Sequence, residues 1–269
     1  MTAVISRQAA EVISFRRNDN NIETVWCRDP QYWYNCNPVL FPYTGPLIDG
    51  KYEYEGKEYH LGQHGFARRA VFEIDEHDQT SVTLSLRQSG ETLAVYPFPF
   101  VLKVRYHLEG YRLILSYEVS NPGEKKLPFD IGFHPAFNCP VTSDKKYEDY
   151  WIEFELDEDL HHPLKNIPDG HRFQIAEHLK SGSFFYENGQ IKSRYCDLTD
   201  GEHVIRVSKE GFETIGFWHK DENTPFMCIE PWSPVSSLEK ENFFRPDTAV
   251  NLLNPGEKFS CEYYIELVR

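Results

Sequence analysis

The sequence predicts an all-β protein, a large antiparallel β-sandwich, on three observations. Apolar and polar residues alternate along several segments, and turn-forming residues separate these segments at short intervals. Helical periodicity over about ten or more residues is nearly absent, and the best helix candidate, residues 174–180, is short. Many short strands joined by regular turns are typical of a sandwich or a barrel.

The alternation is clearest in residues 80–86, 111–119, 152–157 and 259–267. In the last of these, the odd-numbered residues are apolar or aromatic and most of the residues between them are polar. A period of two indicates a strand with one buried and one solvated face. Sheets of such strands are usually antiparallel.

Turn sequences that contain glycine lie between these segments and favour chain reversals. No charge block, low-complexity linker or internal repeat divides the sequence, so we expect a single domain over residues 1–269. The turn sequences are Asp49-Gly50, Glu55-Gly56, Glu109-Gly110, Asn121-Pro122-Gly123, Asp169-Gly170, Glu187-Asn188-Gly189, Asp200-Gly201 and Asn254-Pro255-Gly256.

The composition limits the classes of partner. The chain has 269 residues, 40% of them hydrophobic and 15% aromatic, which is ample for a large core. Its formal net charge is −14. A uniformly acidic protein repels phosphate backbones and anionic membranes, so we expect neither nucleic acid nor a membrane as partner. A neutral sugar is unaffected by this field, whereas a phosphorylated one would need a local basic pocket.

The cysteines and the N-terminus predict a reducing compartment. Residues 1–16 lack the apolar run of a signal peptide, and the sequence has no apolar run of about 18 residues that would predict a membrane span. Six cysteines are scattered without a Cys-x-x-Cys pair. We therefore expect a cytoplasmic protein with reduced thiols. A bond or a shared metal between Cys27 and Cys36 is a minor alternative, because no further residue nearby has ligand spacing.

Residues 29–50 depart from the strand pattern, because they are aromatic, contain several prolines and asparagines, and are long for a loop. Long loops in compact domains are often functional. An extension that covers an edge strand explains the segment equally well.

Two histidines lie in apolar sequence that contains glycine. Gly62 and Gly65 bracket His64 and permit a tight bend, and Pro135 favours an extended backbone at His134. Imidazole titrates near neutral pH, so it readily donates or accepts a proton. Either histidine alone is more often structural, and the pair is the stronger signal. Five others in polar sequence should be solvated: His60, His77, His161, His162 and His178.

Glu230 follows an apolar run that begins at Phe226. A carboxylate there must have a partner or face a cavity, because burying it unpaired is costly. Burial also raises the pKa of a glutamate toward the range useful for a general base. A structural salt bridge with Arg68 or Arg105 is the alternative. Trp232 can stack on a sugar face or belong to the core.

Other chemistries have less support. The sequence contains no GxSxG, Walker, GxGxxG or HExxH motif. His161 and His162 are adjacent, so on a strand they point to opposite faces and do not chelate together. No second carboxylate stands out to pair with Glu230 in a glycosidase. We assign no metal ligands.

Together these segments resemble the aldose 1-epimerase (galactose mutarotase-like) family, and within it the LacX-type bacterial branch. The resemblance implies a galactose mutarotase-like supersandwich with a sugar cleft, a small-molecule sugar substrate, and catalysis without a metal or an organic cofactor. The matching stretches follow the family's order over nearly the whole chain: Pro38-Val-Leu-Phe-Pro42 through Gly45, Gln63-His-Gly-Phe-Ala-Arg68, Gly132-Phe-His-Pro-Ala-Phe-Asn138, Cys228-Ile-Glu-Pro-Trp232 and Leu253-Asn-Pro-Gly-Glu257.

The resemblance implies an isomerase that interconverts the α and β anomers of an aldose. Glu230 matches the family's catalytic base and His134 its catalytic acid. His64 matches the second histidine, which binds the sugar. The further candidates for sugar binding are Arg68, Trp232 and Trp218.

The sequence departs from the family pattern beside two of these motifs. Pro46 stands where an arginine usually follows the glycine, so Arg68, or less well Arg69, is expected to take its place. Ser233 and Pro234 stand where a glycine is usual. These changes leave the acid–base pair intact and put the identity of the sugar in doubt.

The sequence leaves open which sugar binds, whether it is phosphorylated, and whether the chain forms a homodimer. A non-catalytic carbohydrate-binding or sugar-sensing protein on the same fold is the alternative function. A glycan hydrolase is a third, and it would need a second carboxylate within about 5–10 Å of Glu230.

Overall fold

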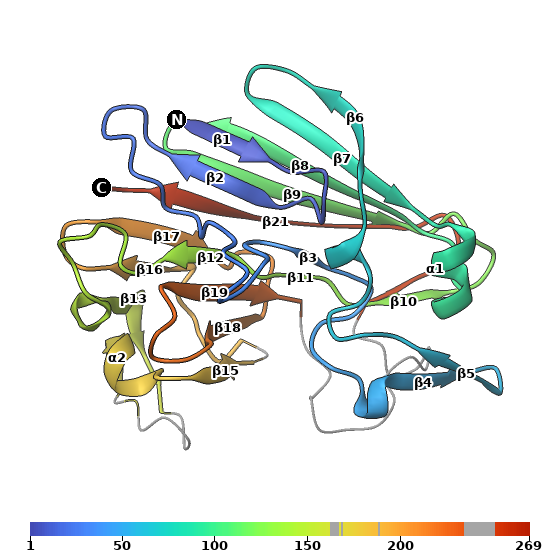
Figure 1. Cartoon of the computed structure of the whole chain (residues 1–269). Coiled ribbons are helices and arrows are strands. Elements are labelled where there is room, and N and C mark those ends of the chain that lie inside the picture. The colour runs from blue at the N-terminus through green and yellow to red at the C-terminus, as the bar shows by residue number, and fades with distance from the viewer. Residues whose placement is uncertain (162–166, 168, 188, 234–250) are drawn as a thin grey trace.

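The computed structural model describes residues 1–161, 167, 169–187, 189–233 and 251–269. Two antiparallel sheets form the body of this part of the chain (Figure 1). His162, Asn188 and Pro234, which the sequence analysis named, lie outside the described residues. No helix in these ranges is long and apolar enough to cross a membrane.

The larger sheet has nine strands within the described residues, and neighbouring strands pair antiparallel. The four segments with the clearest alternation all lie in it, so these strand predictions are confirmed. In spatial order its strands are β14 (Gly170–Gln174), β13 (Trp151–Glu158), β16 (Tyr195–Thr199), β17 (Val204–Ser208), β21 (Lys258–Leu267), β9 (Arg112–Ser120), β8 (Val101–Glu109), β7 (Ser81–Arg87) and β6 (Glu73–His77).

The smaller sheet has six strands in the same ranges, and it includes residues from the segment 29–50 and from the segments around His134 and Glu230. Two residues of the segment 29–50, Val39 and Leu40, form the edge strand of this sheet. The path of the sheet is β15 (Gly182–Tyr186), β18 (Thr214–His219), β19 (Phe226–Trp232), β11 (Gly132–Phe133) and β3 (Val39–Leu40), and β12 (Ala136–Asn138) also pairs with β19.

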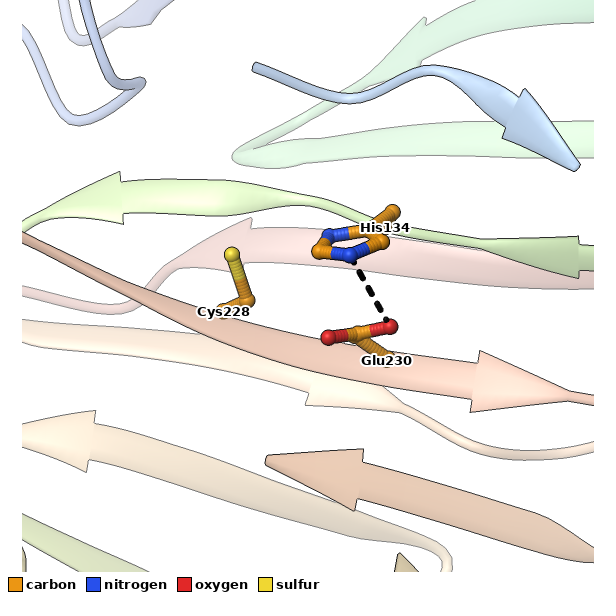
Figure 2. Close-up of side chains that lie close together, drawn as sticks. All are labelled: His134, Cys228 and Glu230. Carbon is orange, nitrogen blue, oxygen red and sulfur yellow. Dashed lines mark ion pairs between the residues drawn. The ribbon is translucent and has the colours of Figure 1, made fainter. Parts of the chain in front are cut away.

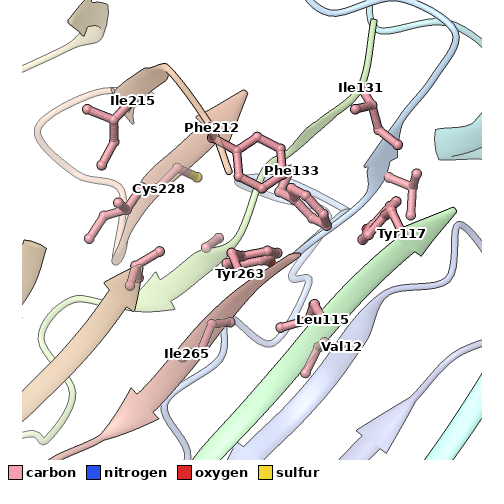
Figure 3. Close-up of a cluster of buried hydrophobic side chains, with 14 of the residues drawn as sticks. Val12, Leu115, Tyr117, Ile131, Phe133, Phe212, Ile215, Cys228, Tyr263 and Ile265 are labelled. Carbon is pink, nitrogen blue, oxygen red and sulfur yellow. The ribbon is translucent and has the colours of Figure 1, made fainter. Parts of the chain in front are cut away.

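The core lies between the two sheets. Phe133 on β11 places its ring centroid 4.1 Å from that of Tyr117 on β9 and 4.1 Å from that of Tyr263 on β21, and all three side chains are buried (Figure 3). Phe154 on β13 and Phe217 on β18 repeat the contact, with centroids 6.1 Å apart. Because burial of aromatic surface is strongly favourable, this packing fixes the smaller sheet against the larger one.

Helices are few and short in the described chain. The candidate at residues 174–180 contains α2 (Ile175–His178), whereas α1 (Gly90–Val95) was not predicted. Six residues are too short to show helical periodicity. The signal that exists is local, because Ser89 and Thr92 form a reciprocal capping box at its start.

Smaller elements complete the described structure. They are the hairpin of β1 (Thr2–Ile5) and β2 (Val12–Arg16), the hairpin of β4 (Lys51–Tyr54) and β5 (Lys57–His60), the pair of β10 (Leu127–Phe129) and β20 (Asn251–Leu253), and the 3-10 turns η1 (Ile48–Gly50), η2 (Ala67–Arg69) and η3 (Tyr147–Asp149).

Two leucines of the larger sheet test where the core lies. Leu115 on β9 is fully buried, whereas Leu156 on β13 is 48% exposed. Leu115→Ala should lower the free energy of unfolding by about 2–5 kcal/mol, because it removes buried methyl groups and leaves a cavity. Leu156→Ala is the matched control and should change it by about 0.5 kcal/mol or less. Urea unfolding measures both, and equal losses would contradict the placement of the core.

Candidate functional site

A pocket of about 520 Å³ lies over the smaller sheet and contains every residue that the sequence singled out for a site. Its walls come from β15, β18 and β19, from the turn after β11, and from two segments near residues 32–46 and 63–68. None of its described lining residues belongs to the nine-stranded sheet. The lining residues are Tyr32, Trp33, Gly45, Pro46, Gln63, His64, Arg68, His134, Ser183, Phe185, Trp218, Lys220, Glu230 and Trp232.

Glu230 and His134 meet at this pocket. Glu230 lies on β19, and His134 follows β11, which pairs with β19. The distance from His134 Nε2 to Glu230 Oε2 is 3.4 Å (Figure 2). Glu230 is 1% exposed and His134 is 7% exposed. The structure therefore holds a carboxyl group and an imidazole in contact, almost out of reach of bulk water.

Burial acts on the two groups in opposite directions. It raises the pKa of Glu230 well above its usual value, against smaller opposing effects of Arg68 and Trp232. It lowers the pKa of His134 well below its usual value, and the nearby His64 and Arg68 lower it further. Both shifts favour the uncharged form, because a charge loses hydration when it is buried.

The sequence left a salt bridge between Glu230 and an arginine as an alternative. In the described part of the chain, the ion-pair contact of Glu230 is with His134 and not with Arg68 or Arg105. Arg105 lines a separate hollow on the larger sheet. Arg68 lines the pocket, whereas the exposed Arg69 does not.

His64 is held by an unusual backbone and by a hydrogen bond. Its φ is 64° and that of Gly65 is 69°, so the chain turns sharply here as the glycines predicted. The backbone N–H of Gly45 donates to His64 Nδ1 at 3.0 Å. Burial lowers the pKa of His64 to about 3. The neutral ring that accepts at Nδ1 carries its proton on Nε2, and the side-chain amide of Gln63 lies 3.2 Å from that atom.

Arg68 is positioned by a chain of buried polar groups. Its Nη2 donates to Asn35 Oδ1 at 3.3 Å, and Asn35 Nδ2 donates to Glu11 Oε1 at 2.9 Å. The same oxygen of Glu11 accepts from the backbone N–H groups of Cys36 and Asn37 at 2.8 and 3.3 Å. Because buried polar groups need partners, this network fixes the segment that forms one wall of the pocket.

Aromatic rings form the remaining walls. The ring centroid of Trp33 lies 4.8 Å from that of His134 and 5.2 Å from that of Trp218. Trp232 packs against Phe185, with centroids 4.6 Å apart, and its indole N–H donates to a backbone carbonyl at 3.1 Å. Trp232 therefore belongs both to the buried structure and to the pocket lining, where the sequence had left the two roles as alternatives.

The sequence did not single out every lining residue. Trp33 and Gln63 lie in segments that it marked as candidates, so a signal existed for them. Phe185 and Lys220 carried none: the pairing of β15 with β18 places Phe185, and Lys220 follows β18. Phe185 packs over Gly216, where a Cβ atom would be 2.3 Å from its ring.

The remaining histidines and the cysteines are partly as expected. His60, His77 and His161 are exposed and His178 is half-buried. All six cysteines are free thiols, with Cys27 exposed and Cys36 buried.

Comparisons with known proteins agree with this fold and pocket. The model of the aldose 1-epimerase family matches residues 1–260. The chain belongs to the aldose 1-epimerase family. Among similar members, the chromosomal LacX protein of Lactococcus lactis subsp. lactis is 31% identical, over 94% of this chain and 92% of that protein. The plasmid form of LacX is 32% identical over the same shares.

Solved structures of family relatives have the same fold. A galactose mutarotase related enzyme from Lactobacillus acidophilus superposes with a TM-score of 0.87 at 28% identity, over 99% of this chain and 94% of that one. A galactose mutarotase-like protein from Lactobacillus casei gives 0.85 at 28% identity, over 98% and 96%. The predicted all-β sandwich and the predicted family are thereby confirmed.

Two glycines beside His64 give a matched test of how the loop holds this side chain. A Cβ atom on Gly65 would lie 2.2 Å from the carbonyl oxygen of Phe41, and its φ is positive, whereas Gly62 has open space. Gly65→Ala should lower the free energy of unfolding by more than about 1 kcal/mol and displace His64. Gly62→Ala should have a smaller effect. Urea unfolding measures both, and equal stability of the two variants would show that the loop is not constrained at Gly65.

Proposed function

We propose that the protein is an aldose 1-epimerase that interconverts the α and β anomers of an aldose by acid–base ring opening. The observation that carries the proposal is the contact between Glu230 and His134, 3.4 Å apart and buried at a pocket of about 520 Å³. Membership of the aldose 1-epimerase family supports it.

In the proposed reaction, the Glu230 carboxylate removes the proton of the anomeric hydroxyl while the His134 imidazolium protonates the ring oxygen. The bond between C1 and the ring oxygen breaks and an aldehyde forms. After rotation about the C1–C2 bond, the ring closes on the other face. His134 then takes its proton back, and Glu230 returns its proton to the aldehyde oxygen. Each transfer contributes about 10²–10⁴ in rate.

The burial of the pair suits a reversible reaction of this kind. While the sugar is open, Glu230 is protonated and His134 is neutral, which are the forms that burial favours. While the ring is closed and ready to react, the two groups are an ion pair, stabilised by their proximity. Each of the two states therefore has its own source of stabilisation.

The rest of the lining supplies groups suited to a sugar. The guanidinium of Arg68 is a hydrogen-bond donor at the pocket, and the Nε2–H of His64 together with the adjacent amide of Gln63 forms a second polar group there. The rings of Trp33 and Trp218 offer apolar faces against which the C–H face of a sugar can pack. We assign substrate binding to these residues and to Trp232.

Exchange of the carboxyl group tests the proposal. Glu230→Gln should reduce the acceleration of α-glucose or α-galactose anomerisation by at least about 10²-fold, because the amide cannot act as the base. Glu53→Gln, at an exposed glutamate, is the matched control and should keep full activity. Polarimetry or NMR on freshly dissolved sugar measures the rate. Full activity in Glu230→Gln would exclude the assigned base.

The same experiment separates the alternatives. A carbohydrate-binding protein without activity would bind sugar equally well in the wild type and in Glu230→Gln and would accelerate nothing. A hydrolase needs a second carboxylate near the first, and in the described part of the chain Glu230 is the one carboxylate that lines the pocket.

Activity should follow a bell-shaped pH profile. The working pair holds one proton. At low pH a second proton binds, to His134. Because the pKa of His134 lies well below 6.5, activity should be lost only at a pH below the usual histidine range. At high pH the pair loses its remaining proton. Because the pKa of Glu230 is raised well above 4.5, the alkaline loss of activity should occur at a pH well above the usual glutamate range. The two apparent pKa values that define the profile belong to the coupled pair and not to either residue alone.

The measurement is the initial anomerisation rate at each pH, after subtraction of the spontaneous rate. A profile that stays flat over the whole pH range in which the protein remains folded, with the chemical step shown to limit the rate, would contradict the acid–base pair.

A further inference from the structure

The acid–base pair has a third neighbour that anomerisation does not use. Cys228 lies two residues before Glu230 on β19, and residues two apart on a strand point to the same face. A ring nitrogen of His134, the Sγ of Cys228 and a carboxylate oxygen of Glu230 lie within 4.8 Å of one another. Figure 2 shows the three side chains converging from two neighbouring segments.

We propose that His134, Cys228 and Glu230 form a binding site for a thiophilic divalent cation such as Zn²⁺ or Cd²⁺, and that the bound cation blocks the sugar pocket. The blocking rests on the proposed function, whereas the binding does not.

The donor set matches this class of cation. Zinc is held by thiolate, imidazole and carboxylate, and sites with three protein ligands leave a fourth position open. Hard cations such as Mg²⁺ and Ca²⁺ prefer oxygen ligands alone, so a thiolate beside an imidazole selects against them. The three residues therefore specify a soft or borderline metal.

The distances are close to those of a bound ion. Bonds of about 2.0–2.3 Å place tetrahedral ligands roughly 3.3–3.8 Å apart, and His134 and Glu230 are already 3.4 Å apart. The limit of 4.8 Å on the whole set means that each remaining pair closes by about 1.5 Å at most. Side-chain rotation supplies a movement of that size.

Charge also favours a cation here. Burial raises the pKa values of the Cys228 thiol and the Glu230 carboxyl group, so metal binding must release their protons to solvent. The thiolate and carboxylate that result neutralise a divalent ion, so the occupied site is uncharged apart from its neighbours. The positive charge of Arg68 opposes cation binding, because it lies close enough to act electrostatically on both Glu230 and His134.

The position of the thiol sets the route of entry. His134 and Glu230 line the pocket, whereas Cys228 is fully buried and does not. A cation therefore reaches the site through the sugar pocket, and its open fourth position faces that pocket. Cation and sugar should exclude each other.

Binding is tested first, without sugar, in a Cys27→Ser background that removes the exposed thiol. Cd²⁺ titration should produce the ultraviolet cadmium–thiolate band with one ion per chain. Cys228→Ser should abolish that band and weaken Zn²⁺, measured against a chromophoric chelator, by at least about tenfold. Cys139→Ser is the matched control, because Cys139 is equally buried and stands outside the cluster. It should bind as the background does.

A second variant tests the site independently in case Cys228→Ser does not fold. Glu230→Gln keeps the thiol and should also weaken Zn²⁺ at least about tenfold, with folding checked by thermal unfolding. Arg68→Gln should tighten binding instead. A cadmium–thiolate band that survives in folded Cys228→Ser, or that is absent from the background protein, would overturn the site.

Blocking is tested by the anomerisation rate with and without Zn²⁺. In the background protein, sugar at saturating concentration should relieve the inhibition. Zinc that binds through Cys228 without slowing an active enzyme would overturn the blocking alone. A protein with no anomerase activity would instead refute the proposed function and leave the binding result as the test of the metal site.

Discussion

Taking a carboxylate and an imidazole out of water is the constraint on which the rest of this structure depends. A buried charge without compensation costs several kcal/mol. Glu230 and His134 limit that cost by lying in contact and by favouring their uncharged forms. Keeping them together requires rigid strands, and the aromatic contacts between the two sheets supply that rigidity. The packing of Phe133 on the larger sheet, next in sequence to His134, thus connects the stability of the core directly to the geometry of the site.

A second buried carboxylate supports the first. Glu11 accepts hydrogen bonds from a side chain and from two backbone groups of the pocket wall. Through Asn35 it holds Arg68, and Arg68 in turn lowers the pKa of Glu230 against the larger effect of burial. Glu11 therefore acts on Glu230 indirectly, because the arginine whose charge acts on Glu230 is held by a group outside the pocket.

The sequence predicted the features whose signals are local. Period-two alternation identified four strands of the larger sheet, because the difference between the buried and the solvated face is visible in the sequence of each strand alone. The glycines around His64 predicted a sharp turn, and the structure has one. The helix α1 was missed because six residues carry no periodicity. Phe185 was missed because the pairing of β15 with β18 places it at the pocket, and Lys220, which follows β18, carries no local signal. Cys228 was quoted as part of a motif, yet its spacing from Glu230 already implied a shared face.

The two sheets differ in what they contribute to the core and to the pocket. The larger one supplies the partner surface for the core, and the pocket takes no described residue from it. A substitution in the larger sheet therefore reaches the pocket only through the packing between the sheets, whereas one in the smaller sheet can change the pocket lining directly. A relative at 28% identity retains this backbone with a TM-score of 0.87. The shape of the pocket is therefore set by a fold that tolerates replacement of most of its side chains.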